Sequence, residues 1–104
     1  MSEKKIEELK RWIAEEESHV AELQRELEFL RALYDLILAI RRMLMASPNL
    51  RDEMKSRIAP ALDEIMNTIA GAIAHDKTCL KEVLPILEAD LAGLKKLLRA
   101  GDRT

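Results

Sequence analysis

Hydrophobic residues recur at helical spacing along most of the chain. In residues 78–100 they step alternately by four and three positions, which is the heptad pattern of a helix packed along one face: Leu80, Leu84, Leu87, Leu91, Leu94 and Leu98. Residues 50–75 carry a comparable stripe: Ile58, Leu62, Ile65, Ile69 and Ile73. Only 3 Gly and 3 Pro are present, which leaves little turn chemistry for a sheet. The pattern predicts an all-α fold.

The N-terminal part of the chain divides in two near Glu26. From residue 3 to 26, 13 of 24 residues are charged, and the apolar ones form a narrow coiled-coil seam with Glu16 in one slot. We expect this seam to be an interaction surface: Ile6, Leu9, Ile13, Val20, Leu23 and Leu27. From Leu27 to Ala46 only 5 of 20 residues are charged, and apolar residues surround the helix. That distribution predicts the central helix of a bundle.

Helix boundaries are marked by capping residues and proline. Ser47-Pro48-Asn49 is the first strong break, and residues 75–78, His-Asp-Lys-Thr, offer caps for a further helix. Gly101 stands where the end of the last helix is expected. These signals predict a single domain over 1–104, an antiparallel bundle of three long helices near 3–45, 50–75 and 78–100, with 1–26 as a charged arm and 27–104 as the main core.

Two alternatives concern these helices. Breaks near Ser18, Pro60 or Pro85 would give four or five shorter helices, because proline kinks a helix or begins a new one. If the first helix is continuous, residues 3–26 extend beyond the other two helices and need a partner, most simply a second copy of the chain. If the helix breaks near Ser18, the seam folds back and closes a monomer.

Charge and cysteine content narrow the classes of partner. The formal net charge is −2, and residues 1–46 carry 8 basic and 10 acidic side chains against 9 of each in 47–104. Neither half has the basic excess that nucleic-acid binding requires. Charges interrupt the most apolar stretch and there is no signal-peptide pattern, so we expect no membrane partner. One cysteine, Cys79, makes no internal disulfide, and a cytoplasmic protein is expected, or a purely recombinant one if it is designed.

Two residue pairs could suggest chemistry. Glu16 and His19 have the Glu-x-x-His spacing of di-metal helical bundles, but the second such pair is missing because His75 is preceded by Ala72. Cys79 follows His75 by four positions, without the third group and oxyanion site of a thiol nucleophile. The sequence therefore predicts no enzyme, metal, cofactor or small-molecule substrate.

The chain as a whole resembles computationally designed helical bundles. It shares their helical composition, balanced surface charge, capped turns and few aromatic residues. It departs from idealised design at Cys79, His75 and the prolines within helices. The resemblance implies a stable scaffold whose function is its fold, with no partner required. The alternative is a natural oligomerisation or protein-interaction module that uses the seam from Ile6 to Leu27.

Overall fold

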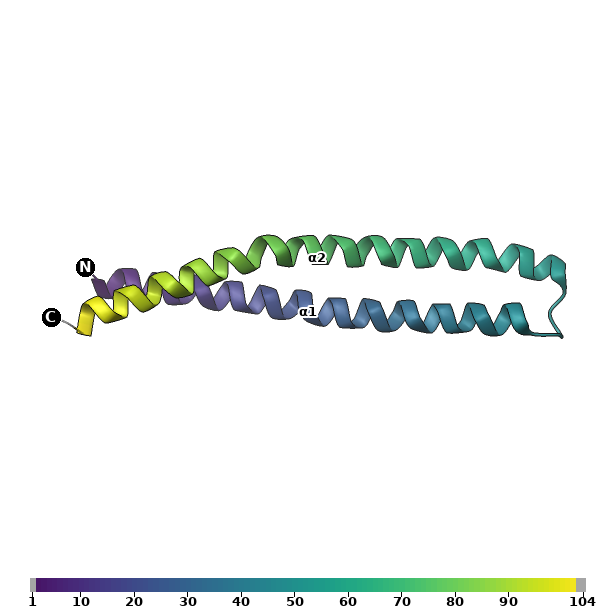
Figure 1. Cartoon of the computed structure of the whole chain (residues 1–104), viewed down its shortest axis with the longest axis horizontal. Helices are drawn as coiled ribbons and strands as arrows, with labels where there is room; N and C mark the ends of the chain where they lie inside the picture. Colours follow the sequence, from purple (N-terminus) through teal and green to yellow (C-terminus); the bar gives the residue numbers. More distant parts are fainter. Residues whose placement is uncertain (1, 103–104) are drawn as a thin grey trace. The chain divides into compact units, whose positions relative to one another are not determined.

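The computed structural model describes the backbone of residues 2–102 and forms two α-helices over that range, with no strand. Helix α1 spans Ser2–Ala46 and helix α2 spans Asp52–Asp102 (Figure 1). The predicted all-α class and the long first helix are both confirmed. The composition explains this outcome, because Leu, Ala, Glu, Lys and Arg are strong helix formers and residues 2–46 contain neither Gly nor Pro.

The connection between the helices forms at the predicted Ser47-Pro48-Asn49 break. The Ser47 N–H donates to the Leu44 carbonyl at 3.3 Å, and the Leu50 N–H donates to the Ser47 carbonyl at 3.4 Å. Asp52 and Glu53 then lie in the first turn of α2, where their negative charges complement the partial positive charge of the helix N-terminus.

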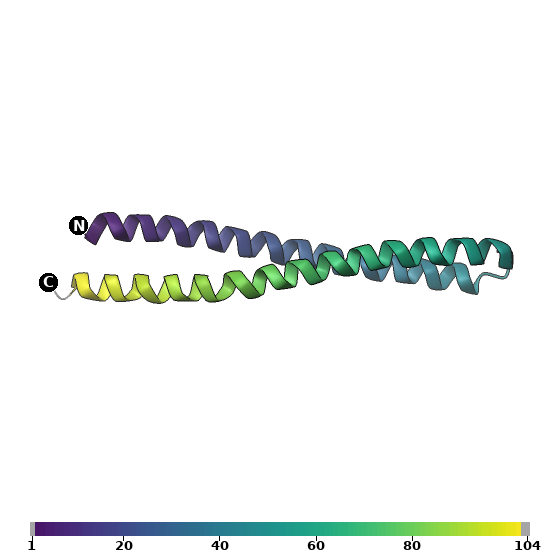
Figure 2. The same cartoon turned by 90° about the horizontal axis from the view of Figure 1, so that it is seen from above.

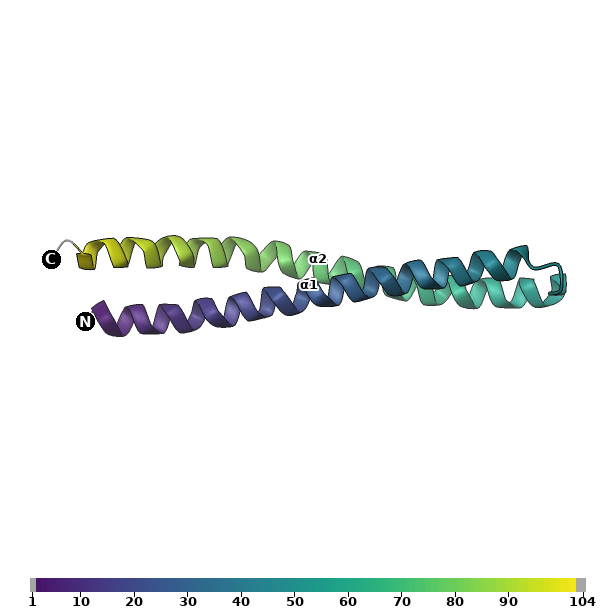
Figure 3. The same cartoon turned by 90° about the horizontal axis from the view of Figure 1, so that it is seen from below.

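The chain divides into two compact units, each built from one segment of each helix. Among the described residues, unit 1 combines 2–25 with 78–102, and unit 2 is the continuous stretch 26–77. Within each unit the α1 and α2 segments run in opposite directions and lie against each other (Figures 1, 2 and 3).

The predicted break at residues 75–78 is wrong, because α2 continues through it. Cap residues permit a helix end but do not force one, and no Gly or Pro interrupts this stretch. The helix also continues through Pro60 and Pro85, and α1 through Ser18. Residues 2–102 therefore form two long helices, where three, four or five are expected from the sequence.

Each helix presents one heptad seam to its partner segment. In α1 the seam has one buried or half-buried residue in each turn: Ile6, Leu9, Ile13, Glu16, Val20, Leu23, Leu27, Leu30, Tyr34, Ile37, Arg41 and Leu44. In α2 the matching seam is Lys55, Ala59, Leu62, Met66, Ile69, Ile73, Asp76, Leu80, Val83, Leu87, Asp90, Leu94 and Leu97. This 4-3 spacing places the seam residues on one side of each helix.

The expectation that Leu27 to Ala46 is a covered central helix is also wrong. Within unit 2 this segment packs against residues 52–77 and leaves Phe29, Leu36 and Met43 exposed. An all-round apolar helix needs neighbours on more than one side, and a two-helix unit supplies one.

Candidate interaction surface

The predicted interaction seam lies against α2 of the same chain. Ile13, Val20, Leu23 and Leu27 are buried. Ile13 and Val20 form a cluster with Leu87 that includes four half-buried neighbours: Leu9, Leu80, Val83 and Leu94. Ile6 is half-buried at the start of α1. In this arrangement the seam closes unit 1 from within and offers little surface to a second chain.

A pair of carboxyl groups interrupts the seam of unit 1. Glu16 meets Asp90, and the pKa of Glu16 is raised above its ordinary value of 4.5, first by a hydrogen bond with Asp90, then by burial and by repulsion from the Asp90 charge. Glu16 Oε2 is shielded from solvent and has no hydrogen-bond donor among protein atoms. Two ionised carboxylates can only accept, so a hydrogen bond between them requires a proton on one of the two.

A second carboxyl pair lies in unit 2. The pKa of Glu26 is raised by the charge of Asp76, by a hydrogen bond with it and by burial, while the His75 charge acts in the opposite direction. Asp76 is only 4% exposed, and its Oδ2 has no donor among protein atoms. Both units therefore hold a site where protonation of one carboxyl satisfies a pair.

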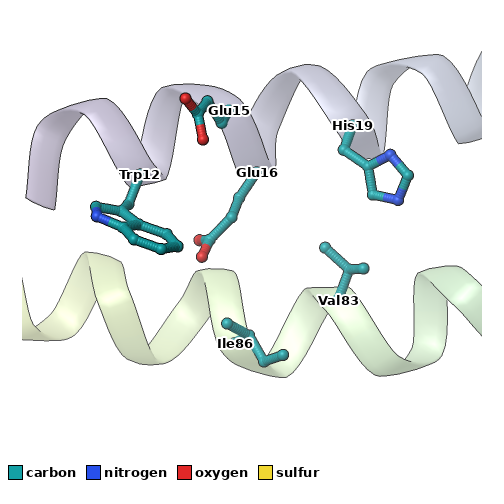
Figure 4. A pocket seen from close by; sticks show the side chains of 6 residues that line it. All are labelled: Trp12, Glu15, Glu16, His19, Val83 and Ile86. Atoms are coloured by element: carbon teal, nitrogen blue, oxygen red, sulfur yellow. The ribbon is translucent and has the colours of Figure 1, made fainter.

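The Glu16 and His19 pair lines an open groove in unit 1. Trp12, Glu15, Glu16 and His19 from α1 and Val83 and Ile86 from α2 line a space of about 260 Å³. Figure 4 shows Trp12 extending from α1 toward α2. Glu16 extends toward α2, whereas Glu15 and His19 lie toward the rim (Figure 4). Among the residues that the structure describes, no three His, Cys, Asp or Glu side chains are grouped so that they could hold a metal ion.

Cys79, the thiol that the sequence singles out, does not line this groove. Cys79 is half-buried in α2, one position before the seam residue Leu80. A side chain at this position contributes to packing beside the seam, as a small apolar residue does.

An ion pair fixes the register of the two segments in unit 2. The Arg41 Nε donates to Asp63 Oδ1 at 2.8 Å and its Nη2 donates to Oδ2 at 3.3 Å. This fork geometry is directional, so it specifies which residues of the two helices lie at the same height. Because the helices are antiparallel, a step of any number of residues back along α1 from Arg41 corresponds to the same number forward along α2 from Asp63. Leu36 is thus level with about Thr68, and Met43 with about Ala61.

Unit 2 carries a second apolar stripe on each helix, outside the seam. On α1 each residue of the stripe immediately precedes a seam residue: Phe29, Leu33, Leu36, Ile40 and Met43. On α2 the same offset gives Met54, Ile58, Ala61, Ile65, Thr68 and Ala72. We call these eleven positions together the outer face. None of them is charged, and Phe29 and Met43 are 65% and 71% exposed.

The two stripes lie on the same side of unit 2. Both are rotated in the same sense from their own seams, by one residue toward the N-terminus. In an antiparallel pair of helices, equal rotations place the two stripes side by side on one face. Sequence reasoning identified these residues as bundle core and missed the surface, although the 4-3 spacing of the α1 stripe is visible in the sequence.

The same offset in the first part of α1 gives a different surface. Residues that precede the seam there include Glu8, Trp12, Glu15, His19 and Glu22, which are mostly polar. The change from a polar to an apolar stripe occurs between Glu26 and Phe29, close to the boundary between the two units.

No protein-family model, curated protein or solved structure matches this chain. Over the part of the chain that the structure describes, neither helix is long and apolar enough to cross a membrane.

Proposed function

We propose that the chain is a non-enzymatic helical module that binds other helices through the outer face of unit 2. One observation carries the proposal: an uncharged stripe of large side chains stays exposed although both seams are already paired within the chain. Exposed apolar surface that is contiguous on one face is a feature of interaction sites, whereas scattered apolar residues are ordinary.

The polar groups of unit 1 support a structural role for this part of the chain. Glu16 is engaged with Asp90, and the groove beside it is lined by Trp12, Val83 and Ile86 together with Glu15 and His19 near its rim. A general acid or base acts on a substrate proton within hydrogen-bond reach, and a carboxyl committed to a neighbour in a helix seam is poorly placed for this task.

A second candidate is that the stable fold is itself the function, as the resemblance to designed bundles implies. The burial of Ile13, Val20 and Leu23 within the chain favours it, because a closed seam needs no partner. The two candidates differ in what they predict for the outer face.

The experiment measures binding of a fluorescently labelled amphipathic peptide, helical and with leucine at the first and fourth positions of three heptads. We expect saturable fluorescence anisotropy with the native chain and a loss of at least tenfold in affinity for Leu36→Lys, because a charge in the middle of an apolar contact must be desolvated.

The matched control is Leu98→Lys, the same change at an exposed leucine of unit 1 (43% exposed, against 57% for Leu36). If both variants bind the peptide as the native chain does, the outer face is not the binding site and the proposal is overturned. If no binding occurs and the chain does not self-associate, the fold-only candidate is preferred.

A further inference from the structure

The occupant of the outer face can be deduced from its area, its shape and its charge. We infer that a second copy of this chain packs on the outer face, so that two copies of unit 2 form an antiparallel four-helix bundle. This inference rests on the proposed function and names its partner.

The area of the face suits a small symmetric dimer. Six large side chains are exposed on it: Phe29, Leu36, Ile40, Met43, Met54 and Ile65. At roughly 100 Å² each they present about 600 Å² of apolar surface per copy. Two copies would bury about 1,200 Å² from these side chains alone, which reaches the lower bound of specific interfaces. Half-buried Leu33 and Ile58 and the alanines add to this area.

The face is complementary to itself in shape. The large residues Leu36 and Met43 of α1 are level with the small residues Thr68 and Ala61 of α2, as the Arg41–Asp63 register requires. If a two-fold axis runs parallel to the helices, α1 of one copy lies over α2 of the other, so that Leu36 and Met43 meet Thr68 and Ala61 in both halves of the interface, while Ile40 meets Ile65. Around Leu36 and Met43 the face therefore fits a copy of itself.

Small residues also border the α1 stripe. Ala32, Ala39 and Ala46 recur every seven residues on the side away from the seam. Alanine at these positions lets the backbone of a neighbouring helix approach, as it does between helices of bundles.

Charge around the face favours a copy of the chain over a strongly charged partner. The residues that border it carry both signs, with Glu28, Asp35 and Glu64 against Arg42 and Arg57. A rim of mixed sign pairs with another rim of mixed sign, and it lacks the cluster of Lys and Arg that draws an apolar face to an anionic membrane.

The first experiment is sedimentation equilibrium of the full chain over a concentration series up to about 500 µM, which detects even weak dimers. We expect a mass that approaches about 24 kDa, twice the 11.9 kDa of one chain. Leu36→Lys should shift the dissociation constant upward by at least tenfold, and Leu98→Lys should leave it unchanged. Circular dichroism confirms that each variant is still helical, which separates loss of association from loss of folding.

The second experiment tests the arrangement in the dimer. In a Cys79→Ser background, Met43→Cys and Ala61→Cys are prepared as separate proteins, so that no disulfide can form within a chain. Oxidation of their mixture should yield more cross-linked dimer than oxidation of either protein alone, because a disulfide requires Cα atoms within about 7 Å. Equal cross-linking in all three samples would overturn the arrangement of α1 over α2.

The outcomes separate the two levels of the proposal. A native chain that remains monomeric throughout but binds the amphipathic peptide through the outer face overturns self-association and retains the interaction module. A native chain that remains monomeric and binds no peptide overturns both. Association with phosphatidylserine vesicles that Leu36→Lys abolishes, without a dimer, would assign the face to a membrane surface instead.

Discussion

Carboxyl groups occupy three positions in the seams that aliphatic side chains fill in an ordinary coiled coil. Glu16, Asp76 and Asp90 lie among leucines and isoleucines, and each belongs to a pair of acids across the two helices. Like charges held together and removed from water destabilise the ionised state of the pair. The sequence shows Glu16 in its slot, but the pairing could not be predicted, since it depends on the register between helices that are distant in the sequence.

These pairs predict that the chain is more stable at mildly acidic than at neutral pH. The pKa of Glu16 and that of Glu26 are raised in the folded state above the ordinary value of 4.5. A raised pKa means that the folded state holds the proton more tightly than the unfolded state does. The stabilisation that comes from each raised pKa is complete below about pH 4.5 and is lost as pH rises through the pKa of the folded state. Urea unfolding followed by circular dichroism at several pH values above 4.5 measures this decline.

The matched variant is the double change Glu16→Gln and Glu26→Gln, in which an amide donates to the partner carboxylate at every pH. We expect a higher urea midpoint at pH 7.5 than in the native chain and a flatter pH profile. The control Glu17→Gln removes one charge from an exposed neighbour and should keep the native slope. A double variant with the native slope would rule out the carboxyl pairs as its origin.

At the scale of the helices, the sequence predicts their class and their outer limits better than their number. Helix α1 and the turn after it follow from the absence of Gly and Pro in residues 2–46 and from Pro48. Helix α2 was divided in error because capping residues at 75–78 and two prolines are local signals. The seam of α2 runs through residues 75–78 without interruption, at Ile73, Asp76 and Leu80. Burial of these residues against α1 favours a continuous helix more strongly than the capping residues favour a helix end.

Replacing Pro60 measures how much stability the chain loses because α2 continues through a proline. It is the ninth residue of α2, so it has no N–H to donate to the Ser56 carbonyl and its ring crowds that carbonyl. We expect Pro60→Ala to stabilise the chain by about 1–2 kcal/mol. Alanine restores a hydrogen bond inside the helix, which raises stability, and it gives the unfolded chain more conformational freedom, which offsets part of that gain. Thermal and urea unfolding give the value.

Pro48→Ala serves as the comparison for this change. Pro48 lies in the connection between the helices, where it interrupts no helical hydrogen bond. Its replacement should leave stability unchanged or lower it slightly, because it only frees the unfolded chain. A Pro60→Ala variant no more stable than the native chain would show that α2 accommodates the proline without loss.

Over the whole molecule, the two units differ in how well they are closed. Unit 1 holds the buried residues Ile13, Val20, Leu23 and Leu87 and exposes Trp12 and Ile86 among others, whereas unit 2 holds only Leu27 and Ile69 as buried apolar residues and exposes the outer face. Composition alone indicated one covered core, since nearly half of the residues are hydrophobic. It could not reveal that much of this apolar content faces outward.

This difference predicts a dependence of amide exchange on protein concentration. In dilute solution, amides of residues 13–23 should exchange more slowly than those of residues 29–43, because better packed helices open less often. At high concentration, residues 29–43 and 54–65 should gain protection while residues 13–23 stay unchanged. Hydrogen exchange with mass spectrometry at about 1 µM and 500 µM tests this, with Leu36→Lys as the variant that should show no gain.

The division into units also sets an order of events during synthesis. Residues 26–77 are contiguous, so unit 2 can pair its helices as soon as they have left the ribosome. Residues 2–25 emerge before unit 2, yet their partner segment, 78–102, emerges after it. At roughly 5–20 residues per second the N-terminal segment waits several seconds with Ile13, Val20 and Leu23 uncovered. The high charge of residues 3–26 then acquires a second role, since it keeps a half-finished chain apart from its neighbours until its own C-terminal segment arrives.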